Sequence, residues 1–460
     1  MHGDKPVNPN LLINQLRLDA THSIVEAIQR IESDALKIAL VLDNDRRLLG
    51  VVTDGDVRRF LLNGGQPGQP VSACMNRNFH AVRVGTSREE LLKTFDLGYG
   101  VLPVLDAQGC LVDLYSRQMA ASPEEPVLAR ARAPVRMSFS GGGSDLTYFF
   151  IDNPAAVLSC TVDIYARATL TPRHDRQIVI QTEDLDQKEC HDSLAALQET
   201  ANKTLLATIV SVIRPEYGFE LGISADFPVG SGLGGSSAVT TAIIAAFNEL
   251  RQDRWNTYEI AELAFQAERL CFGIAGGWQD QYASAFGGFN LIVFENQRNL
   301  VHPIRLEDAI RNELEANLLL CNTGLTHDSG ELHEQQRREM EAESQTDLLA
   351  ASVALCHRMH RHLIRGELRQ FGQGMDEAWQ LKRRFCGGVS DSLLDSIYAA
   401  AMAAGALGGK LLGAGGGGYF LFYVSPQQRR SVARAVRALG CQTQNFRFDF
   451  TGVTSWRAKI

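Results

Sequence analysis

The chain has 460 residues, which is too long for one hydrophobic core, because single cores stop growing at roughly 250 to 300 residues. A hydrophobic content of 45% and a charged content of 21% are typical of folded globular domains and argue against a disordered or fibrous chain. The net charge of -8, without a dense Lys/Arg block, argues against nucleic-acid binding. We expect two or three globular domains.

The sequence shows no sign of export or of membrane insertion. Its first residues, MHGDKPVNPN, lack the pattern of a signal peptide, and no run of about 18 apolar residues occurs. The nine cysteines are scattered, with no Cys-x-x-Cys pair and no His at zinc spacing. We therefore expect a cytoplasmic protein without membrane contact, whose thiols are reduced and mostly buried.

An internal repeat occupies residues 13–120, after an N-terminal tail at 1–12. The tripeptide VLD at 41–43 recurs at 104–106, an offset of 63. Each copy has a helix with a capping-box start, SIVE from Ser23 and SREE from Ser87, followed by two short strands around a polar turn. The pattern predicts two copies of one βαβ-type unit.

This pair resembles a tandem CBS regulatory module, and its most specific segment is GVVTDGDVRR at 50–59. The resemblance implies that Thr53 and Asp56 hold the ribose of a regulatory nucleotide or nucleotide sugar, since a carboxylate can accept hydrogen bonds from both ribose hydroxyls. The alternative role of Asp56 is to cap the following helix. The second copy has Ser116 and Met119 at the matching positions, so one nucleotide site is expected. The pair is also a candidate surface for homo-oligomerisation.

A linker at 121–129 separates the repeat from a body of the α+β class, which we divide into an N-terminal part, 130–305, and a C-terminal part, 306–460. The linker ASPEEPVLAR is rich in proline and glutamate and lacks periodicity. Beyond it, strand-like runs such as 177–182 and 219–225 alternate with long helical patterns. Three glycine-rich segments organise this body: RAPVRMSFSGGGSDL at 132–146, FPVGSGLGGSSA at 227–238 and KLLGAGGGGYFLFYV at 410–424.

The second glycine-rich segment carries the signature of a phosphate-binding loop. Glycines let the backbone approach a polyanion and direct several N-H groups at it, and a helix that begins near Ser236 adds the positive end of its dipole. A serine hydroxyl can bind phosphate or contribute a ligand to Mg2+. The residues expected to bind phosphate are Gly230, Ser231, Gly232, Leu233, Gly234, Gly235, Ser236 and Ser237.

Two other phosphate-binding motifs fit this segment less well. Its Gly-x-Gly-x-x-Gly spacing matches the dinucleotide fingerprint, which would indicate an NAD-dependent oxidoreductase. That fingerprint needs a buried parallel strand before it, whereas FELGISA at 219–225 alternates like a half-exposed antiparallel strand. A Walker A loop needs Lys after its last glycine, and Gly235 is followed by Ser236.

The segment PVGSGLGGSSA is similar to the phosphate loop of the GHMP kinases, and the other two glycine-rich segments match this family in order and position. The resemblance covers 130–460 and implies a GHMP kinase fold, ATP as the phosphate donor and Mg2+ as the cofactor. Gly235 is an extra residue relative to the family loop, so the assignment of the metal-binding serine is open between Ser236 and Ser237, and we favour Ser237.

The resemblance also implies a catalytic aspartate and a second metal ligand. A helix is predicted over 256–272, with Leu270 and Cys271 on its inner face and Glu268 on the flank of that face. In the family, a glutamate on this helix helps to hold Mg2+. Asp280, in a glycine-rich turn, matches the catalytic aspartate that orients the acceptor hydroxyl or takes its proton. The alternatives are a solvated charge for Glu268 and a turn-forming role for Asp280.

The acceptor is expected to contact the first and third glycine-rich segments. Arg136 and Asp145 are candidates for gripping sugar hydroxyls. Lys382 shares a helical face with apolar residues, where a substrate phosphate would explain it; the alternative is a last-turn lysine that reaches water. The expected substrate-binding residues are Arg136, Gly142, Gly143, Asp145, Lys382, Gly415 and Gly416.

Among the GHMP kinases, SGGGSD, GLGGSSA and GGWQDQYASAFGG most resemble the D-glycero-D-manno-heptose 7-phosphate kinases. The expected activity is therefore ATP-dependent phosphorylation of a sugar or sugar phosphate at the anomeric hydroxyl, feeding nucleotide-sugar synthesis. A kinase for another sugar such as fucose is the first alternative. A non-catalytic nucleotide sensor is the second, although a sensor would not need Asp280.

Overall fold

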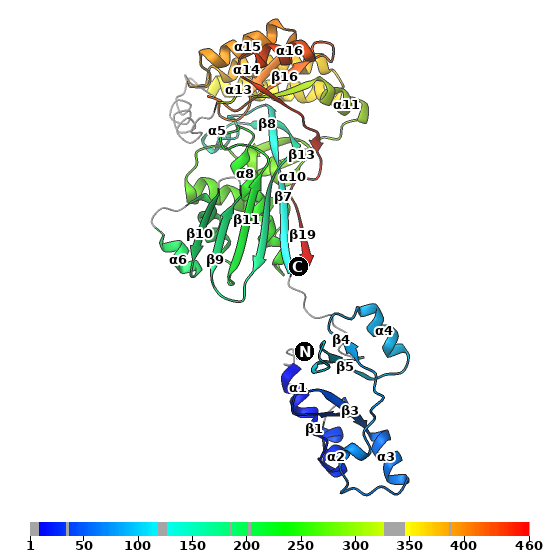
Figure 1. The fold of residues 1–460 in the computed structure, drawn as a ribbon. Coiled ribbons are helices and arrows are strands. Elements are labelled where there is room, and N and C mark those ends of the chain that lie inside the picture. Colours follow the sequence, from blue (N-terminus) through cyan, green and yellow to red (C-terminus); the bar gives the residue numbers. More distant parts are fainter. Residues whose placement is uncertain are drawn as a thin grey trace. The chain divides into compact units, whose positions relative to one another are not determined.

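The computed structural model describes residues 9–33, 36–117, 127–183, 186–200, 204–325, 346–385 and 388–459, with side chains from residue 13 onward. The chain divides into two compact units, Met1–Glu125 and Pro126–Ile460 (Figure 1). Each unit has its own sheets and hydrophobic clusters.

The first unit contains two three-stranded sheets with the same topology, as the repeat predicts. In each, a first strand is parallel to the second, and the second is antiparallel to the third. Both antiparallel pairs carry an irregularity at the matching place, between Val41 and Leu42 and between Val104 and Leu105. The elements are α1 (Pro9–Leu16), β1 (Arg17–Asp19), α2 (Ile24–Ser33), β2 (Ile38–Leu42), β3 (Leu48–Thr53), α3 (Asp54–Leu62), a 3-10 turn (Val71–Ala73), β4 (Val82–Arg83), α4 (Arg88–Asp96), β5 (Val101–Leu105) and β6 (Leu111–Ser116).

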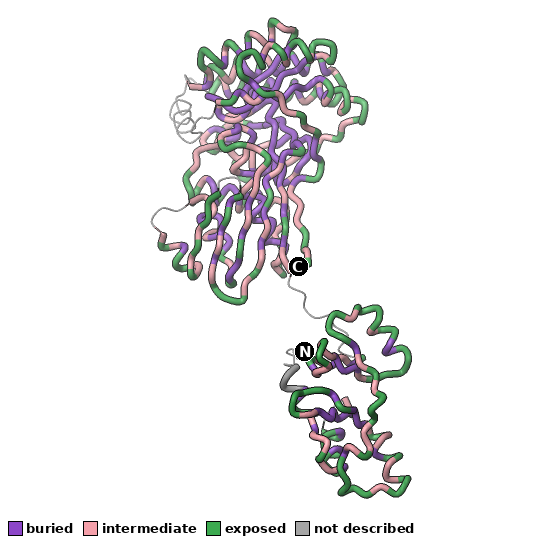
Figure 2. Tube along the Cα trace, viewed as in Figure 1, coloured by how far each residue is buried: buried purple, intermediate pink, exposed green. Residues whose placement is uncertain are grey.

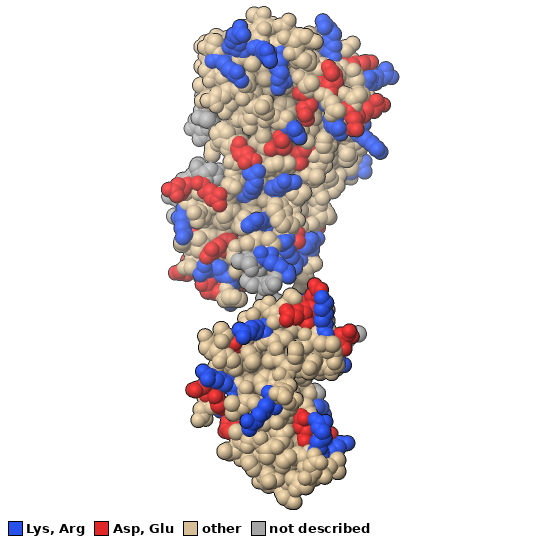
Figure 3. Space-filling model, turned by 45° about the vertical axis from the view of Figure 1, so that its right-hand side comes forward, with Lys and Arg blue, Asp and Glu red and all other residues tan. Residues whose placement is uncertain are grey.

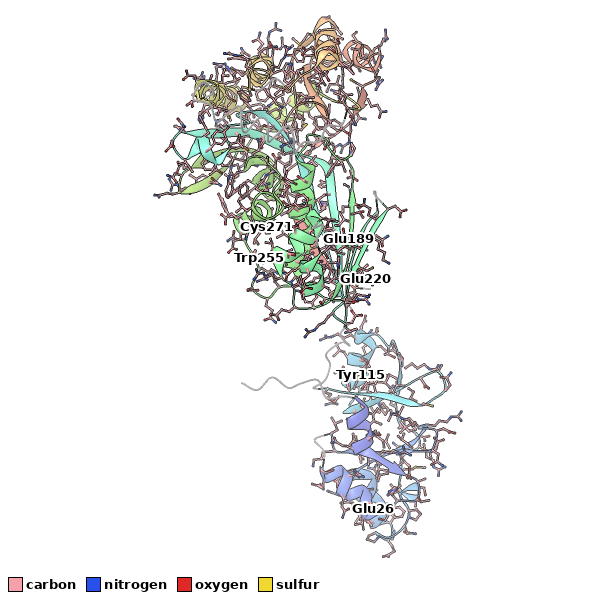
Figure 4. All side chains as sticks on the ribbon, turned by 90° about the vertical axis from the view of Figure 1, so that its left-hand side faces the viewer. Glu26, Tyr115, Glu189, Glu220, Trp255 and Cys271 are labelled. Carbon is pink, nitrogen blue, oxygen red and sulfur yellow. The ribbon has the colours of Figure 1, made fainter. Side chains whose placement is uncertain are left out.

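The predicted capping box is complete at the first helix start of the repeat, and its N-cap half is present at the second. At α2, Glu26 (labelled in Figure 4) accepts hydrogen bonds from the backbone N-H and hydroxyl of Ser23 at 2.7 and 2.8 Å. At α4, the Ser87 hydroxyl accepts a bond from the Glu90 N-H. The two copies share part of their core, because Leu111 of the second copy belongs to the same hydrophobic cluster as Leu40 of the first.

The expected tail and linker both give way to regular structure earlier than predicted. Helix α1 begins at Pro9, inside the expected tail, and β7 begins at Val127, inside the expected linker. Residues 1–8 and 118–126 lie outside the described residues. The strand starts early because residues 127–132 pair with the last strand of the chain, a partner that the local sequence does not reveal.

The second unit is built on a nine-stranded sheet in the order β10-β9-β11-β8-β12-β13, with β7, β18 and β19 joined beside it. Strands β7 and β8 are its long central pair, and α8 and α13 pack against them. The elements up to β13 are β7 (Val127–Ser140), α5 (Thr147–Phe150), β8 (Ala155–Pro172), β9 (Ile178–Thr182), β10 (Gln187–His191), α6 (Leu194–Glu199), α7 (Leu205–Ile213), β11 (Phe219–Ala225), α8 (Gly235–Leu250), α9 (Thr257–Phe265), a π-helical segment (Gln266–Phe272), α10 (Gln279–Phe286), β12 (Phe289–Glu295) and β13 (Arg298–Pro303).

A four-stranded antiparallel sheet in the order β15-β16-β14-β17 forms the rest of this unit, with helices α13 to α16 around it (Figure 1). The chain then returns to the first sheet, where β18 pairs with β8 and β19 with β7, so residues 448–459 do not stay with the expected C-terminal part. The elements are α11 (Asp308–Asn317), β14 (Leu318–Asn322), α13 (Thr346–Ile364), α14 (Leu368–Lys382), α15 (Ser392–Ala403), β15 (Ala406–Leu411), β16 (Tyr419–Val424), α16 (Arg429–Arg437), β17 (Gln442–Gln444), β18 (Phe448–Asp449) and β19 (Thr454–Lys459).

Buried segments run through the middle of the second unit (Figure 2), where β7, β8 and α8 contribute to the same hydrophobic cluster. Acidic and basic side chains are interspersed on the face of each unit shown in Figure 3. No helix in the described part of the chain is long and apolar enough to cross a membrane. Of the eight described cysteines, all are free thiols, but only four are buried, fewer than expected.

Candidate active site

The phosphate-loop segment is a glycine turn that leads directly into a buried helix. Gly230, Gly232 and Gly234 have φ values of 74°, 73° and 75°, a region that favours glycine. Gly234 is the N-cap of α8, so the first N-H groups of this helix are at the end of the loop. Strand β11 before the loop is antiparallel to β8 and parallel to β9, which is not the all-parallel setting of a dinucleotide-binding unit.

The third glycine-rich segment packs backbone to backbone on this loop. A Cβ atom at Gly413 would lie 2.5 Å from the Gly232 Cα, and one at Gly418 would lie 2.4 Å from the Ser231 carbonyl oxygen. Gly415 and Gly416 are not among the residues that line the cavity beside Asp280, so their expected contact with the substrate stays a prediction. Gly416 donates to the Val389 carbonyl at 3.0 Å, and a Cβ atom at Gly415 would lie 2.8 Å from the Val389 Cα, so these two glycines pack on Val389. Gly413 and Ala414 are the residues of this segment that line the cavity.

Ser237 and Glu268, the two expected metal ligands, lie side by side. The Ser237 hydroxyl donates to Glu268 Oε2 at 2.7 Å, and Gln281 Nε2 donates to the same oxygen at 2.6 Å. Ser237 and Glu268 are both fully buried, and the other oxygen, Glu268 Oε1, has no hydrogen-bond partner. Ser236 is half-buried in the first turn of α8. A buried carboxylate oxygen without a partner is costly, which is what a cation would relieve.

The inward position of Glu268 depends on a π-helical segment that the sequence pattern did not predict. The regular helix α9 ends at Phe265, and residues 266–272 continue with wider turns. As a result, Leu270 and Cys271 are exposed, although they were expected on the inner face, while Glu268 moves from the flank into the interior (Cys271 is labelled in Figure 4). Such segments are frequent at functional sites.

Asp280 is held by Arg136 and lies beside the phosphate loop. It is the second residue of α10, where the helix dipole favours a negative charge, and not part of a turn as expected. Arg136 Nε and Nη2 donate to its two carboxylate oxygens at 2.8 and 2.9 Å, and Arg136 Nη1 donates to the Gly232 carbonyl at 2.5 Å. Arg136 therefore orients Asp280 and the loop, and the expected contact of Arg136 with the acceptor stays a prediction.

A cavity of about 80 Å³ opens beside this ion pair, and Gly142, Gly143 and Asp145 line it as expected. Asp145 is buried and accepts bonds from the N-H groups of Gly143 and Gln279 at 3.0 and 3.1 Å. Its burial and the neighbouring charge of Asp280 raise the pKa of Asp145. Asp280 has a cationic partner, whereas no described ion pair includes Asp145, so the two acids have different roles available to them.

Sequence reasoning missed several polar groups of this cavity. Ser138 and Ser140, on β7, are buried there, and neither hydroxyl has a hydrogen-bond partner. Gln279 donates from Nε2 to Asp145 at 3.2 Å, and its Oε1 has no hydrogen-bond partner. Ser138 and Ser140 share one face of β7, because alternate residues of a strand do so. They could have been predicted only if the cavity had been known to lie on that face.

Two lysines also line the cavity. Lys382, at the end of α14, donates from Nζ to the carbonyl oxygens of Leu411 and Gly413, at 2.9 and 2.5 Å, so it faces the interior and not the water. Lys410, on β15, was not predicted. Its burial, with a smaller effect from the charge of Arg136, lowers the pKa of Lys410 to about 7. Gly409 before Lys410 and Leu411 after it gave no sequence signal that this position faces a cavity.

In the first unit, Thr53 and Asp56 form a capping box at the start of α3. The Thr53 hydroxyl and N-H donate to Asp56 Oδ2 at 2.7 and 2.9 Å, and Arg59 donates to Oδ1 at 2.6 Å. The capping role of Asp56 is therefore present. In the second copy, Ser116 is buried, and Met119 lies outside the described residues.

Comparison with known proteins agrees with this geometry. The family models for the GHMP kinases N terminal domain, the GHMP kinases C terminal region and the CBS domain match residues 196–288, 359–440 and 14–63. D-glycero-alpha-D-manno-heptose 7-phosphate kinase of Campylobacter jejuni is 33% identical over 334 residues, which are 71% of this chain and 98% of that protein.

Two further relatives differ in how much of them the chain covers. L-fucokinase/L-fucose-1-P guanylyltransferase of Bacteroides fragilis is 25% identical over 75% of this chain, which spans 38% of that protein. The crystal structure of a D-glycero-D-manno-heptose 1-phosphate kinase from Bacteroides thetaiotaomicron is similar with a TM-score of 0.61 and 27% identity, over 72% of this chain and all of that one.

The glycine loop at the start of α8, the buried acids and the cavity beside them define a small-molecule kinase that uses ATP. The acceptor of such an enzyme is an alcohol group. The chain belongs to the GHMP kinase family and carries a CBS domain at its N-terminus.

Proposed function

We propose that this enzyme transfers a phosphate from ATP to the anomeric hydroxyl of a sugar phosphate, with a heptose 7-phosphate as the preferred acceptor. The observation that carries the proposal is the Arg136–Asp280 pair, which lies between the phosphate loop and a cavity lined with polar groups. The similarity to heptose phosphate kinases supports the choice of acceptor. Fucose is the alternative acceptor, supported by the similarity to a fucokinase.

In this proposal, the residues of the cavity divide the work between the two substrates. The N-H groups of the loop and of the first turn of α8 bind the phosphates of ATP. Asp145, Ser138 and Ser140 accept or donate hydrogen bonds to the hydroxyls of the sugar. Asp280 orients the attacking hydroxyl and accepts its proton. Because the transition state of phosphoryl transfer is loose, orientation is the larger part of that role.

Ser237 and Glu268 would hold Mg2+, and the partnerless Glu268 Oε1 fits a cation there. Mg2+ prefers oxygen ligands and keeps few protein ligands when phosphates complete its shell. When bound, it neutralises charge on the phosphate oxygens.

The test is ATP turnover on a panel of sugars and sugar phosphates with the wild-type enzyme and the Asp280→Asn variant. We expect turnover with a heptose 7-phosphate, and a decrease of at least about a hundredfold in the variant with ATP binding retained. Asp308→Asn is the control, because Asp308 is also in the first turn of a helix but is exposed. ATP binding without turnover of any sugar would favour the nucleotide sensor instead.

A further inference from the structure

The cavity contains more positive than negative side chains. Four basic residues line it, Arg136, Arg269, Lys382 and Lys410, against two acids, Asp145 and Asp280, and the three besides Lys410, whose pKa is lowered to about 7, already outnumber the acids. One of the acids is already committed, because both oxygens of Asp280 pair with the guanidinium of Arg136. A cavity of this composition favours an anionic ligand over a neutral one.

Arg269 stands out among these cations by the partners it has. Both of its hydrogen bonds are made by Nη1, to the carbonyl oxygens of Ile274 and Ala275 at 3.3 and 3.2 Å. Its Nε is buried and has no hydrogen-bond partner, and no ion pair among the described residues includes Arg269. Two neutral carbonyls leave its charge without a counterion, and the Nε–Nη2 edge of a guanidinium matches two oxygens of a phosphate.

Two glycines bring Arg269 next to the acceptor side of the cavity. A Cβ atom at Gly276 would lie 2.8 Å from the Arg269 Cζ, and one at Gly277 would lie 1.9 Å from Asp145 Oδ2. The Arg269 guanidinium therefore lies against Gly276, and the Asp145 carboxyl lies against Gly277, the next residue. Neither glycine has a side chain that would occupy this space. Gly234 of the phosphate loop lies next to the Arg136–Asp280 ion pair of the cavity instead, because a Cβ atom there would lie 3.4 Å from Arg136 and from Asp280.

The π-helical segment explains how two successive residues serve two different sites. Glu268 points to Ser237 on the phosphate-loop side, and Arg269 lines the cavity beside Asp145. The wider turn lets both charged side chains reach the interior, while Leu270 is left exposed.

We propose that Arg269 binds the phosphate group that the acceptor sugar already carries, and so makes the enzyme prefer a sugar phosphate to the same sugar without phosphate. This inference rests on the proposed function and assigns its substrate preference to one side chain. The phosphates of ATP are the other source of the same chemistry, and the position of Arg269 beside Asp145 favours the acceptor.

The experiment compares kcat/KM for a heptose 7-phosphate and for the unphosphorylated heptose in the wild type, Arg269→Gln and Arg269→Lys. We expect Arg269→Gln to lower kcat/KM for the phosphorylated acceptor roughly 10- to 100-fold, as expected for loss of a charged hydrogen bond. The values for the unphosphorylated sugar and the KM for ATP should change less than about threefold, and Arg269→Lys should recover part of the loss. Arg298→Gln, an exposed arginine on β13, is the matched control.

Gly276→Ala provides a second test, because it keeps the charge of Arg269 but displaces the guanidinium. It should also lower kcat/KM for the phosphorylated acceptor. Equal losses for both sugars would overturn the inference, and so would an increase confined to the KM for ATP. Calorimetric binding of heptose 7-phosphate to the wild type and Arg269→Gln separates this inference from the proposed function. Sugar-phosphate binding that depends on Arg269, without turnover, would support the inference and contradict the kinase.

Discussion

Glu268 and Asp280 are acids of the same site, and their surroundings set their roles. Asp280 receives two hydrogen bonds from one guanidinium, which fixes its carboxylate toward the cavity. Glu268 receives two hydrogen bonds on one oxygen only, from neutral donors, and its second oxygen remains available to a cation. A carboxylate with an arginine partner is oriented, whereas a buried one with a partnerless oxygen can bind a metal.

We predict that Ser237→Ala and Glu268→Gln each raise the Mg2+ concentration needed for half-maximal rate, by about tenfold or more, because each removes a ligand of the ion that bridges the ATP phosphates. Titration of the rate with Mg2+ measures this. Ser236→Ala is the matched control at the neighbouring position. If half-saturation is unchanged in both variants, the metal is bound elsewhere.

Lys410 should make the stability of the second unit depend on pH. Its folded pKa is about 7 and its ordinary value is 10.5, so between these values the unfolded chain binds a proton that the folded chain does not. Stability therefore rises with pH across this window. We expect the free energy of unfolding of the wild type to rise about 2 kcal/mol more than that of Lys410→Met between pH 7 and pH 9. Parallel curves from denaturant titrations of the two proteins would contradict this.

At the scale of elements, backbone-to-backbone contacts assemble the active site. The phosphate loop and the third glycine-rich segment touch through Gly232 and Gly413, and strand β7 donates from the Arg136 N-H to the Leu233 carbonyl at 3.0 Å. The loop is thus clamped between a strand of the large sheet and the turn after β15. Its shape is prepared before ATP arrives, which reduces the cost of ordering it.

Gly413→Ala should loosen this clamp. Gly413 has a φ of 69°, and its new Cβ would meet the Gly232 Cα at 2.5 Å. Gly324→Ala is a matched control, since Gly324 has a φ of 73° but a Cβ atom added there would have nothing within 4 Å. We expect Gly413→Ala to cost about 1 to 3 kcal/mol more stability than the control and to raise the KM for ATP. Equal thermal midpoints and equal KM values in the two variants would show that the contact is unimportant.

At the scale of the whole molecule, the two units are separate compact bodies, and the catalytic residues all lie in the second. The match to the Campylobacter jejuni kinase spans 334 residues, about the length of the second unit, and 98% of that relative. The CBS domain model matches within the first unit, and regulation is the role that we propose for this unit.

A chain that begins at Pro126 retains the pairing of Val127 with Lys459 and should keep basal kinase activity. It should lose any response to adenine nucleotides or nucleotide sugars, which we expect to be about five- to 150-fold at most in the full chain. Asp56→Ala should abolish the response in the full chain, with Asp54→Ala as the control, because Asp54 pairs only with the exposed Arg58. A folded but inactive truncated chain would mean that the first unit supports the active site.

The thermal midpoint of the first unit in Asp56→Ala separates the two roles of that carboxylate. Loss of a capping residue lowers helix stability by about 1 kcal/mol, without affecting nucleotide binding as such. Nucleotide binding by Asp56→Ala at wild-type affinity, measured by calorimetry, would leave Asp56 with the capping role alone.

Local chemistry was enough to predict the repeat, the capped helix starts and the glycine loop before α8. Each of these depends on residues a few positions apart, such as Ser23 with Glu26, so a sequence pattern records it directly. The family resemblance then supplied the fold class and the acids at 145, 268 and 280, because their order along the chain is part of the motifs.

Tertiary structure alone decided which groups share the cavity. Arg136 and Asp280 are 144 residues apart, and their pairing depends on how β7 and α10 pack. Lys410 is surrounded by apolar neighbours in the sequence, so only the fold reveals that it faces a cavity. Arg269 depends on the π-helical segment, where one wider turn changes the face of every later residue. The sequence motifs determined the type of site, and the packing of distant strands and helices determined which residues line it.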